Sequence, residues 1–260
     1  MRIATWNVNS LKARMPRVEE WLSYAGPDVL CLQETKLAEA TFPHMAFSAL
    51  GYESVHHGDG QWNGVAILSK VGIERGSFGF TDPVEADSET RLVTASCGGV
   101  IVCSVYVPNG RSVDSEHYKY KLAWLEKLRH HLDLVANPDE PVAVCGDFNI
   151  APDDSDVWSP EAFVGSTHVT PAEREALRDL EGWGLVDAFR HRYPEDRLYS
   201  YWDYRAGDFH EHRGMRIDLL LLSKPLAGKI SWALVDRNAR KGKLPSDHAP
   251  VFVDVDLEAA

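Results

Sequence analysis

The chain has 260 residues, of which 44% are hydrophobic and 25% are charged, and its formal net charge is −12. This composition excludes a disordered chain or a coiled coil, and no apolar run is long enough to span a lipid bilayer. Taken as an average, the excess of carboxylates argues against a polyanionic partner such as nucleic acid.

Short runs rich in valine, isoleucine and leucine alternate with helical patterns along the whole chain. Many runs are apolar at every position, which is typical of strands buried on both faces in a layered α/β protein. Gly64–Lys70 resembles Arg216–Lys224, as two similar β-rich halves packed face to face would produce. No linker interrupts the pattern, so we expect one domain over residues 1–260. The predicted strands are Arg2–Val8, Asp28–Gln33, Gly64–Ser69, Leu92–Ala95, Val100–Val107, Val142–Cys145, Ile217–Leu222 and Val251–Val255.

Three helices are predicted from apolar residues at helical spacing. The first follows Pro16 and carries Val18, Trp21 and Leu22 on one face. The second covers Ser115–Ala136, with a stripe of leucines. The third has a capping box, in which Thr170 and Glu173 satisfy each other's backbone N–H groups, and Pro171 stands in its first turn. The four cysteines lie in apolar runs without CxxC spacing, and no signal peptide precedes the first strand, which together predict buried, reduced thiols in a cytoplasmic protein.

Polar side chains cluster at the ends of five predicted strands, where α/β proteins place catalytic groups. Each of them alone could be an ordinary turn or a solvated charge, except Asp218, which is flanked by apolar residues and is expensive to bury without a partner. Five such strand ends together are not explained by packing. The residues are Asn7 and Asn9, Glu34 and Lys36, Asp147 and Asn149, Asp218, and Asp247 with His248.

The available side chains restrict the chemistry. The chain has no G-x-S-x-G, P-loop, G-x-G-x-x-G or zinc-type Cys/His spacing, and the histidines at 56–57, 130–131, 210 and 212 are interpreted as surface groups. Carboxylate and amide oxygens are ligands for Mg²⁺ or Mn²⁺. Together with one histidine, they fit the metal-assisted hydrolysis of a phosphate ester.

The polar motifs occur in an order and with neighbours that resemble the exonuclease III family of DNA-repair nucleases, within the endonuclease/exonuclease/phosphatase superfamily. The resemblance covers nearly the whole chain and implies a four-layer α/β sandwich, with two mixed β-sheets packed face to face and helices outside. The motifs are Trp6–Asn9, Leu32–Lys36, Val105–Gly110, Gly146–Pro152, Gly214–Asp218 and Ser246–Pro250, supported by Trp183–Arg190 and Tyr199–Arg205.

The resemblance also implies roles in catalysis. Asp147 would orient and deprotonate the attacking water, and Asn149 would bind the scissile phosphate. His248 would stabilise the charge of the transition state, held and kept cationic by Asp218. Two further groups, Tyr106 and Asn109, would contact the phosphate. The metal, Mg²⁺ or Mn²⁺, would be bound mainly by Glu34, with Asn7 and Asp247 close to it and Lys36 orienting the carboxylates.

Substrate recognition is implied by the same resemblance. An apolar pocket for a base-free sugar would involve Tyr201, Met215 and Ile217, with Trp202 alongside, although the two aromatic residues could equally be core residues. His168 lies in a loop that faces DNA in the family, and it either contacts DNA or is solvated. Such loops are expected to tune exonuclease against abasic-site activity. Arg91 and Arg111 are further candidates for phosphate contacts.

The expected function is a metal-dependent DNA-repair phosphodiesterase that acts as a monomer on double-stranded DNA, with no membrane partner. Its activities would be 3′→5′ exonuclease, cleavage at abasic sites and cleaning of blocked 3′ ends. Two alternatives fit the sequence less well. The segments Tyr199–Arg205 and Gly214–Asp218 argue against a hydrolase of phosphoinositide- or sphingomyelin-type esters. A catalytically inactive DNA-binding scaffold would lack some of the site residues, and all five are present: Glu34, Asp147, Asn149, Asp218 and His248. Residues 185–245 hold twelve basic and eight acidic side chains, so DNA contact is expected to be confined to one basic-rimmed face despite the net charge.

Overall fold

Two six-stranded β-sheets form the centre of the computed structural model, which describes residues 1–81 and 87–257. From edge to edge, the first sheet contains β11 (Ile230–Val235), β12 (Val251–Val255), β1 (Arg2–Asn7), β2 (Val29–Gln33), β4 (Val65–Ser69) and β3 (Glu53–His57). The second contains β5 (Glu74–Phe78), β6 (Leu92–Cys97), β7 (Val100–Tyr106), β8 (Val142–Asp147), β10 (Asp218–Ser223) and β9 (Leu185–Asp187). In each sheet one neighbouring pair is parallel, β1 with β2 and β7 with β8, and the other pairs are antiparallel.

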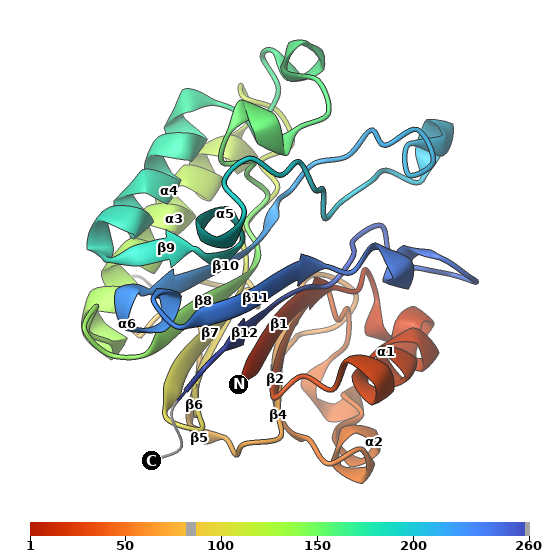
Figure 1. Cartoon of the computed structure of the whole chain (residues 1–260), viewed down its shortest axis with the longest axis vertical. Helices are drawn as coiled ribbons and strands as arrows, with labels where there is room; N and C mark the ends of the chain where they lie inside the picture. Colours follow the sequence, from red (N-terminus) through yellow and green to blue (C-terminus); the bar gives the residue numbers. More distant parts are fainter. Residues whose placement is uncertain (82–86, 258–260) are drawn as a thin grey trace.

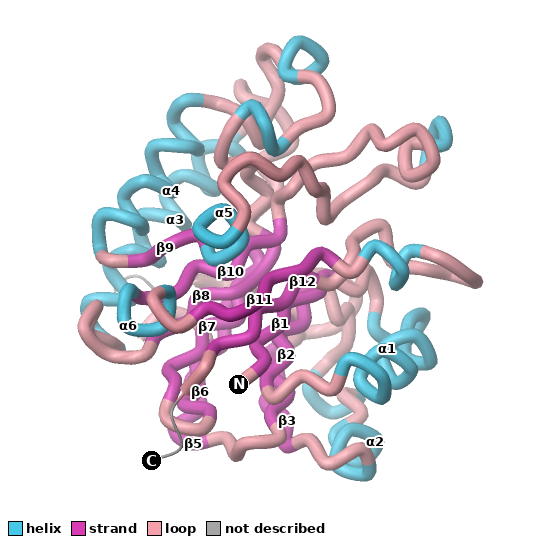
Figure 2. The backbone as a smooth tube through the Cα atoms, viewed as in Figure 1, coloured by secondary structure: helices cyan, strands magenta, loops and turns pink. Residues whose placement is uncertain are grey.

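The two sheets pack face to face and helices cover their outer faces, which confirms the predicted four-layer α/β sandwich (Figures 1 and 2). The first sheet is covered by α1 (Leu11–Ala25) and α2 (His44–Ala49), and the second by α3 (Glu116–Val135) and α4 (Pro171–Trp183). Two short helices, α5 (Ala188–Arg192) and α6 (Lys224–Ala227), contact β10 and β9. No helix in residues 1–81 or 87–257 combines the length and apolar character needed to cross a bilayer.

Alternation along the inner strands explains their apolar sequence. Ile3 of β1 points into the core between the sheets, whereas Ala4 and Trp6 point to the core under α1. Because both faces of the inner strands are covered, nearly every position is buried. All eight inner strands were predicted, and the strands without a prediction are the four at the sheet edges.

The similarity between the segments Gly64–Lys70 and Arg216–Lys224 reflects the architecture. β4 and β10, which carry the two similar segments, each lie one strand in from an edge and run antiparallel to the second strand of their sheet's parallel pair. α1 connects the parallel strands of one sheet, and α3 connects those of the other. The two halves of the chain therefore repeat one arrangement.

The predicted helix boundaries hold for two of the three helices. Ser115 caps α3, and Thr170 and Glu173 form the predicted capping box at α4. The prediction for the first helix was wrong in one respect, because α1 begins at Leu11 and contains Pro16. A proline in the second turn removes one backbone hydrogen bond but leaves the burial of the apolar face unchanged. All four cysteines are buried and free, as predicted.

Candidate active site

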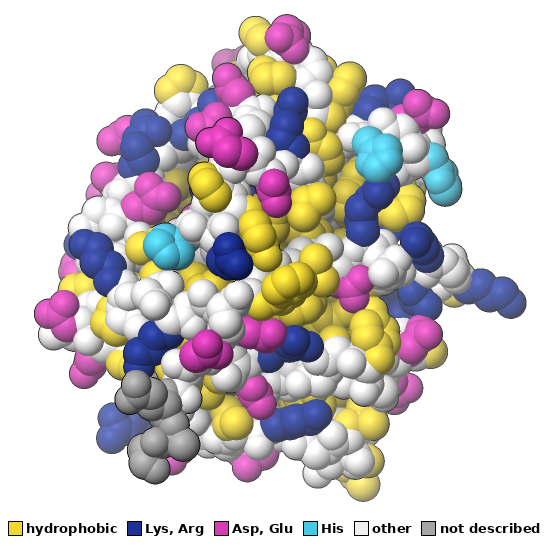
Figure 3. All heavy atoms as spheres, in the orientation of Figure 1, with side chains coloured by type: hydrophobic (Ala, Val, Ile, Leu, Met, Phe, Trp, Pro, Cys, Tyr) yellow, Lys and Arg dark blue, Asp and Glu magenta, His cyan; other side chains and the backbone are white. Residues whose placement is uncertain are grey.

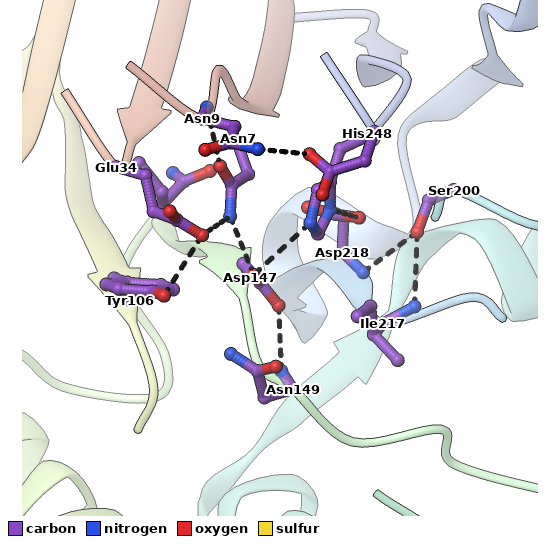
Figure 4. A network of polar contacts seen from close by, with 12 residues as sticks. Asn7, Asn9, Glu34, Tyr106, Asp147, Asn149, Ser200, Ile217, Asp218 and His248 are labelled. Carbon is purple, nitrogen blue, oxygen red and sulfur yellow. Dashed lines mark hydrogen bonds and ion pairs between the residues drawn. The ribbon is translucent and has the colours of Figure 1, made fainter. Parts of the chain in front are cut away.

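The predicted polar residues meet at one end of the two sheets. β1 ends at Asn7, Glu34 follows β2, and β8 ends at Asp147. β10 runs antiparallel to β8, so its first residue, Asp218, is paired in register with Asp147. His248 stands shortly before β12, which begins next to the end of β1. Five separate chain segments therefore contribute to one cluster (Figure 4).

Asn7 connects the two sheets at the centre of this cluster. Its Nδ2 group donates hydrogen bonds to Oε1 of Glu34, at 2.8 Å, and to Oδ2 of Asp147, at 2.9 Å (Figure 4). Its Oδ1 atom accepts the backbone N–H of Asn9 at 3.0 Å. In this arrangement Asn7 presents its amide N–H groups to the carboxylates and so fixes the distance between them.

Glu34 is partly accessible, and its carboxylate is bonded by Asn7, Lys36 and Tyr106. The Lys36 ammonium lies 2.8 Å from its Oε2 atom, and the Tyr106 hydroxyl donates to its Oε1 atom at 3.0 Å. Burial raises the pKa of Glu34, but the Lys36 charge and the Asn7 hydrogen bond outweigh it and hold that pKa below its usual value. Glu34 is therefore an anion at neutral pH.

The side-chain oxygen and nitrogen atoms of Glu34, Asp147 and His248 lie within 4.8 Å of one another, and the two carboxylates of this group could hold a metal ion. Asp247 is tied to the same region through Asn9, whose Nδ2 donates to its Oδ1 atom at 3.1 Å and whose Oδ1 accepts from Lys36 at 2.6 Å. The carboxylate oxygens suit a hard divalent cation such as Mg²⁺ or Mn²⁺. The donor set thus fits the predicted cofactor.

His248 is oriented by Asp218. Its Nδ1 atom lies 2.8 Å from Oδ2 of Asp218, and its Nε2 atom lies 3.8 Å from Oδ2 of Asp147. Burial lowers the pKa of His248, but the charges of Asp218 and Asp147 outweigh burial and raise that pKa to about 10. His248 is therefore a buried cation whose Nε2 faces the carboxylate cluster.

Asp147 has the opposite perturbation. Burial raises the pKa of Asp147 to about 7, with a contribution from the negative charge of Asp218, against the lowering effects of His248 and Asn7. A carboxylate poised near neutral pH is able to exchange a proton with water during a reaction. The backbone N–H of Asn149 holds its Oδ1 atom at 2.9 Å.

Asn149 and Asn109 form a pair of amides next to Asp147. Asn109 donates from Nδ2 to Oδ1 of Asn149 at 3.1 Å, and Asn149 donates from Nδ2 to the carbonyl of Val107 at 3.0 Å. Asn149 has a positive φ of 51°, a left-handed conformation that asparagine tolerates better than most residues. The backbone turn after β8 therefore directs this side chain towards Asn109.

A cavity of about 430 Å³ opens beside the cluster, and it brings together four of the residues predicted to contact substrate. Tyr201 places its ring 4.9 Å from that of His248. Ile217 and Trp202 are 2% and 1% exposed and support the cavity from the core without lining it. Trp202 is therefore a core residue in this structure, and its ring packs against that of Phe209. The predicted residues that line the cavity are Arg111, His168, Tyr201 and Met215.

The two candidate arginines differ in their surroundings. Arg91 stacks over the ring of Tyr106, 4.7 Å from its centroid, and pairs with Glu89, so it holds Tyr106 in place. Arg111 is exposed at the rim of the cavity. Figure 3 shows hydrophobic side chains across the middle of one face and lysine and arginine side chains on the loops at its right side. Arg111 is thus the better placed of the two to meet a ligand from solution.

Two histidines interpreted as surface groups are buried, which corrects that expectation. His56 lies under Phe42 with ring centroids 4.2 Å apart and bonds Thr35, next to Glu34. His131 faces the second sheet from α3 and bonds Thr94. Sequence reasoning also missed Lys121 and Glu173, a fully buried ion pair behind Asn149. Nothing in the sequence distinguishes Lys121 from the other lysines of its helix as a buried residue. The capping box is by itself a sufficient reason for a glutamate at position 173, so Glu173 did not indicate a second role.

The chain is similar to known proteins over nearly its full length. Residues 4–248 match the model of the Endonuclease/Exonuclease/phosphatase family. The exodeoxyribonuclease III of Haemophilus influenzae is 32% identical over 266 residues, covering 98% of this chain and 99% of the relative. An AP endonuclease from Archaeoglobus fulgidus superposes with a TM-score of 0.95 at 38% identity, covering 99% of this chain and 100% of that one. The 3′ phosphatase NExo from Neisseria, bound to a product DNA hairpin, has a TM-score of 0.95 at 37% identity with the same coverage.

Proposed function

The chain belongs to the endonuclease/exonuclease/phosphatase family and is a hydrolytic nuclease related to DNA-repair enzymes, and we propose that it hydrolyses phosphate esters of damaged double-stranded DNA with a divalent cation. One observation carries the proposal. The side-chain oxygen and nitrogen atoms of Glu34, Asp147 and His248 lie within 4.8 Å of one another. This combination supplies a base, a positive charge and a metal ligand to one phosphate.

In the proposed mechanism Asp147 orients a water molecule and accepts its proton. Its pKa of about 7 allows it to do so near neutral pH. The water attacks phosphorus, the bond to the departing oxygen breaks with its electron pair on that oxygen, and the departing oxygen takes up a proton from solvent. His248, held by Asp218, stabilises the negative charge that develops on the phosphoryl oxygens. Asn149 and Asn109, which are hydrogen-bonded to each other in the structure, donate hydrogen bonds to the same phosphate. Tyr106, whose hydroxyl lies next to Glu34, contacts the phosphate on the side where the metal would bind.

The cation that we propose is Mg²⁺ or Mn²⁺, held mainly by Glu34 with Asp247 nearby. When bound, it would neutralise charge on the scissile phosphate. Asn7 would hold Glu34 and Asp147 at a fixed separation, as its two hydrogen bonds do in the structure. Lys36 would keep Glu34 ionised.

The substrate is proposed to be duplex DNA with a 3′ end or an abasic site, and the activities to be 3′→5′ exonuclease, abasic-site endonuclease and 3′-end cleaning. Proteins with each of these names are among the relatives, which supports the range but does not rank the activities. The cavity lined by Tyr201 and Met215 would receive the sugar next to the cleaved bond. His168, which also lines this cavity, would contact the DNA and adjust the balance between these activities.

The test is a side-by-side measurement of hydrolysis rates on a recessed 3′ end, a 3′-phosphate end and a duplex with one abasic-site analogue, each with and without EDTA. Metal-dependent hydrolysis of at least one substrate is expected. Hydrolysis of none of them, or equal rates in EDTA, would overturn the proposal. An inositol phosphate lipid serves as the comparison substrate, because the alternative function would be revealed by preference for it.

We further propose that residues 1–260 act as one domain and as a monomer in the cytoplasm. The core between the two sheets is continuous and draws residues from both halves of the chain, which supports a single unit. The four buried, unpaired cysteines are compatible with a reducing compartment. Sedimentation of the purified protein would test the monomeric state, and fractionation of the source cells would test the cytoplasmic location.

A further inference from the structure

A buried ion pair lies directly behind the two amides of the site. Lys121 of α3 and Glu173 of α4 have no exposed side-chain surface, and Nζ of Lys121 lies 2.5 Å from Oε1 of Glu173. Burial of a lysine is costly unless its hydrogen bonds are made inside the protein. The hydrogen-bond partners of this ammonium group therefore indicate which parts of the chain it fixes in place.

The other partners of Lys121 are the backbone carbonyls of the two amide residues and, at 3.5 Å, the hydroxyl of Thr167. Its Nζ group donates to the carbonyl oxygen of Asn149 at 2.6 Å and approaches that of Asn109 at 3.3 Å. The side chains of Asn109 and Asn149 are themselves hydrogen-bonded to each other. One ammonium group thus fixes the backbone beneath both side chains.

Glu173 fixes the loop on the other side of the pair. Its Oε1 atom accepts the Thr167 hydroxyl at 2.7 Å and the backbone N–H of His168 at 2.9 Å. His168 in turn donates from Nδ1 to the carbonyl oxygen of Asn149 at 2.5 Å, which closes the network. The loop that lines the cavity and the turn that carries Asn149 therefore share one anchor.

The packing around the lysine stem leaves little freedom. Gly110, with φ of 90°, follows Asn109, and a Cβ atom there would lie 3.2 Å from Cδ of Lys121 and 2.8 Å from the Thr167 hydroxyl. The hydroxyl of Ser115, which caps α3, also bonds the Gly110 carbonyl at 2.7 Å. The turn at 109–110 is thus pressed against Lys121 and tied to the start of the same helix.

We propose that the Lys121–Glu173 pair is a positioning device for the reaction, which sets Asn109 and Asn149 at the phosphate by holding their backbone carbonyls. This inference rests on the proposed function of the two amides. Neither residue of the pair touches the reacting atoms. Displacement of a catalytic group by about 1 Å is able to reduce turnover by roughly 10²-fold, so a small shift of this turn is sufficient to be measured.

The experiment compares turnover and folding in variants that remove the pair without leaving a buried charge. The double variant Lys121→Met/Glu173→Gln keeps the shape of both side chains and the oxygen that caps α4. We expect its kcat on the preferred DNA substrate to fall roughly 10-fold or more, with KM changed less than threefold and a cooperative thermal transition retained. The matched control is Lys119→Met, an exposed lysine of the same helix that pairs with Glu116. It should match the parent protein.

A double-mutant cycle separates positioning from general destabilisation. Lys121 acts through Asn109 and Asn149 in the proposal. Adding Lys121→Met/Glu173→Gln to the double variant Asn109→Ala/Asn149→Ala should therefore reduce kcat by less than twofold further. A folded pair variant with kcat within twofold of the parent would overturn the inference, as would full additivity in the cycle. If the pair variant does not fold, Lys121→Arg is measured instead. The planar guanidinium group points its N–H donors in other directions than the ammonium group does, but it keeps the positive charge. A kcat within twofold of the parent then overturns the inference, and a folded protein with reduced kcat supports it.

The outcomes for the two proposals are distinguishable. An inactive parent protein contradicts the proposed function and leaves the pair without a reaction to position. An active parent whose pair variants are equally active contradicts only the positioning role.

Discussion

Oδ2 of Asp218 lies 2.8 Å from Nδ1 of His248, and this contact joins the second sheet to the segment before the last strand of the first sheet. The remaining oxygen of Asp218, Oδ1, is buried and has no hydrogen-bond partner among the described residues. The carboxylate is therefore committed to the histidine. Its position in the chain, among apolar residues, had already indicated that it needed a partner.

Replacing Asp218 should reduce activity far more than the accompanying loss of stability would explain. In Asp218→Ala the imidazole loses the group that orients it and keeps it cationic, so we expect kcat to fall by roughly 10²-fold or more. Asp218→Asn, which keeps the shape but not the charge, should also be strongly impaired. Steady-state kinetics on proteins with verified cooperative melting would measure both. Asp139→Ala, an exposed residue at the other end of β8, is the control, and near-normal turnover in a folded Asp218→Ala protein would contradict the assignment.

Metal binding should be visible without any substrate. A cation that binds the folded chain and not the unfolded one raises the melting temperature. We expect Mg²⁺ or Mn²⁺ to raise the melting temperature of the EDTA-treated parent protein and to have little effect on Glu34→Gln, since that carboxylate is the proposed main ligand. Scanning fluorimetry over a metal titration measures the shift. Glu126→Gln, on the exposed side of α3, should respond like the parent, and an undiminished shift in Glu34→Gln would exclude Glu34 as the main ligand.

The sequence was sufficient to predict the inner strands and not the edge strands, for a physical reason. Inner strands are covered on both faces and read as continuous apolar runs. Edge strands such as β5 are largely exposed, and the sequence Glu74–Phe78 has no apolar run to reveal it. Their pairing depends on partners that are distant in the chain, which a local pattern does not encode.

A similar division applies to the site. Glu34, Asp147 and His248, which the structure brings together, could be selected as candidates because each stands in a polar motif next to an apolar run. Lys121 could not, since its burial depends on the approach of α4 and of the turn at Asn149. His131 was misread for the same reason, because the second sheet covers it only in the folded chain.

The burial of His131 should make stability depend on pH. Burial lowers the pKa of His131 from 6.5 to about 4 in the folded protein, where Nδ1 accepts the backbone N–H of Thr81. Between these values the unfolded chain binds a proton that the folded chain does not, so the free energy of unfolding decreases as the pH falls. From pH 7 to pH 5 this one group should lower it by about 2 kcal/mol.

Urea denaturation of the parent protein and of His131→Gln at the two pH values would test this. The variant should be less stable at pH 7 but should lose about 2 kcal/mol less than the parent on acidification, because the titrating group is gone. His117→Gln, exposed on the same helix, should retain the parent's pH dependence. An equal loss in the His131→Gln protein would show that His131 does not contribute.

The net charge of −12 makes the salt dependence of DNA binding informative. If contact is confined to the face around the cavity, Arg111 at its rim should neutralise a phosphate and release counterions. Arg111→Gln should therefore weaken binding similarly for all DNA sequences and reduce the slope of log K against log salt by about 1. Lys229→Gln is the control, because Lys229 precedes β11 at the far end of β12 from His248. Fluorescence anisotropy over a salt series measures both slopes. An unchanged slope in Arg111→Gln, or binding by the parent protein that salt does not weaken, would contradict a local, electrostatic contact on this face.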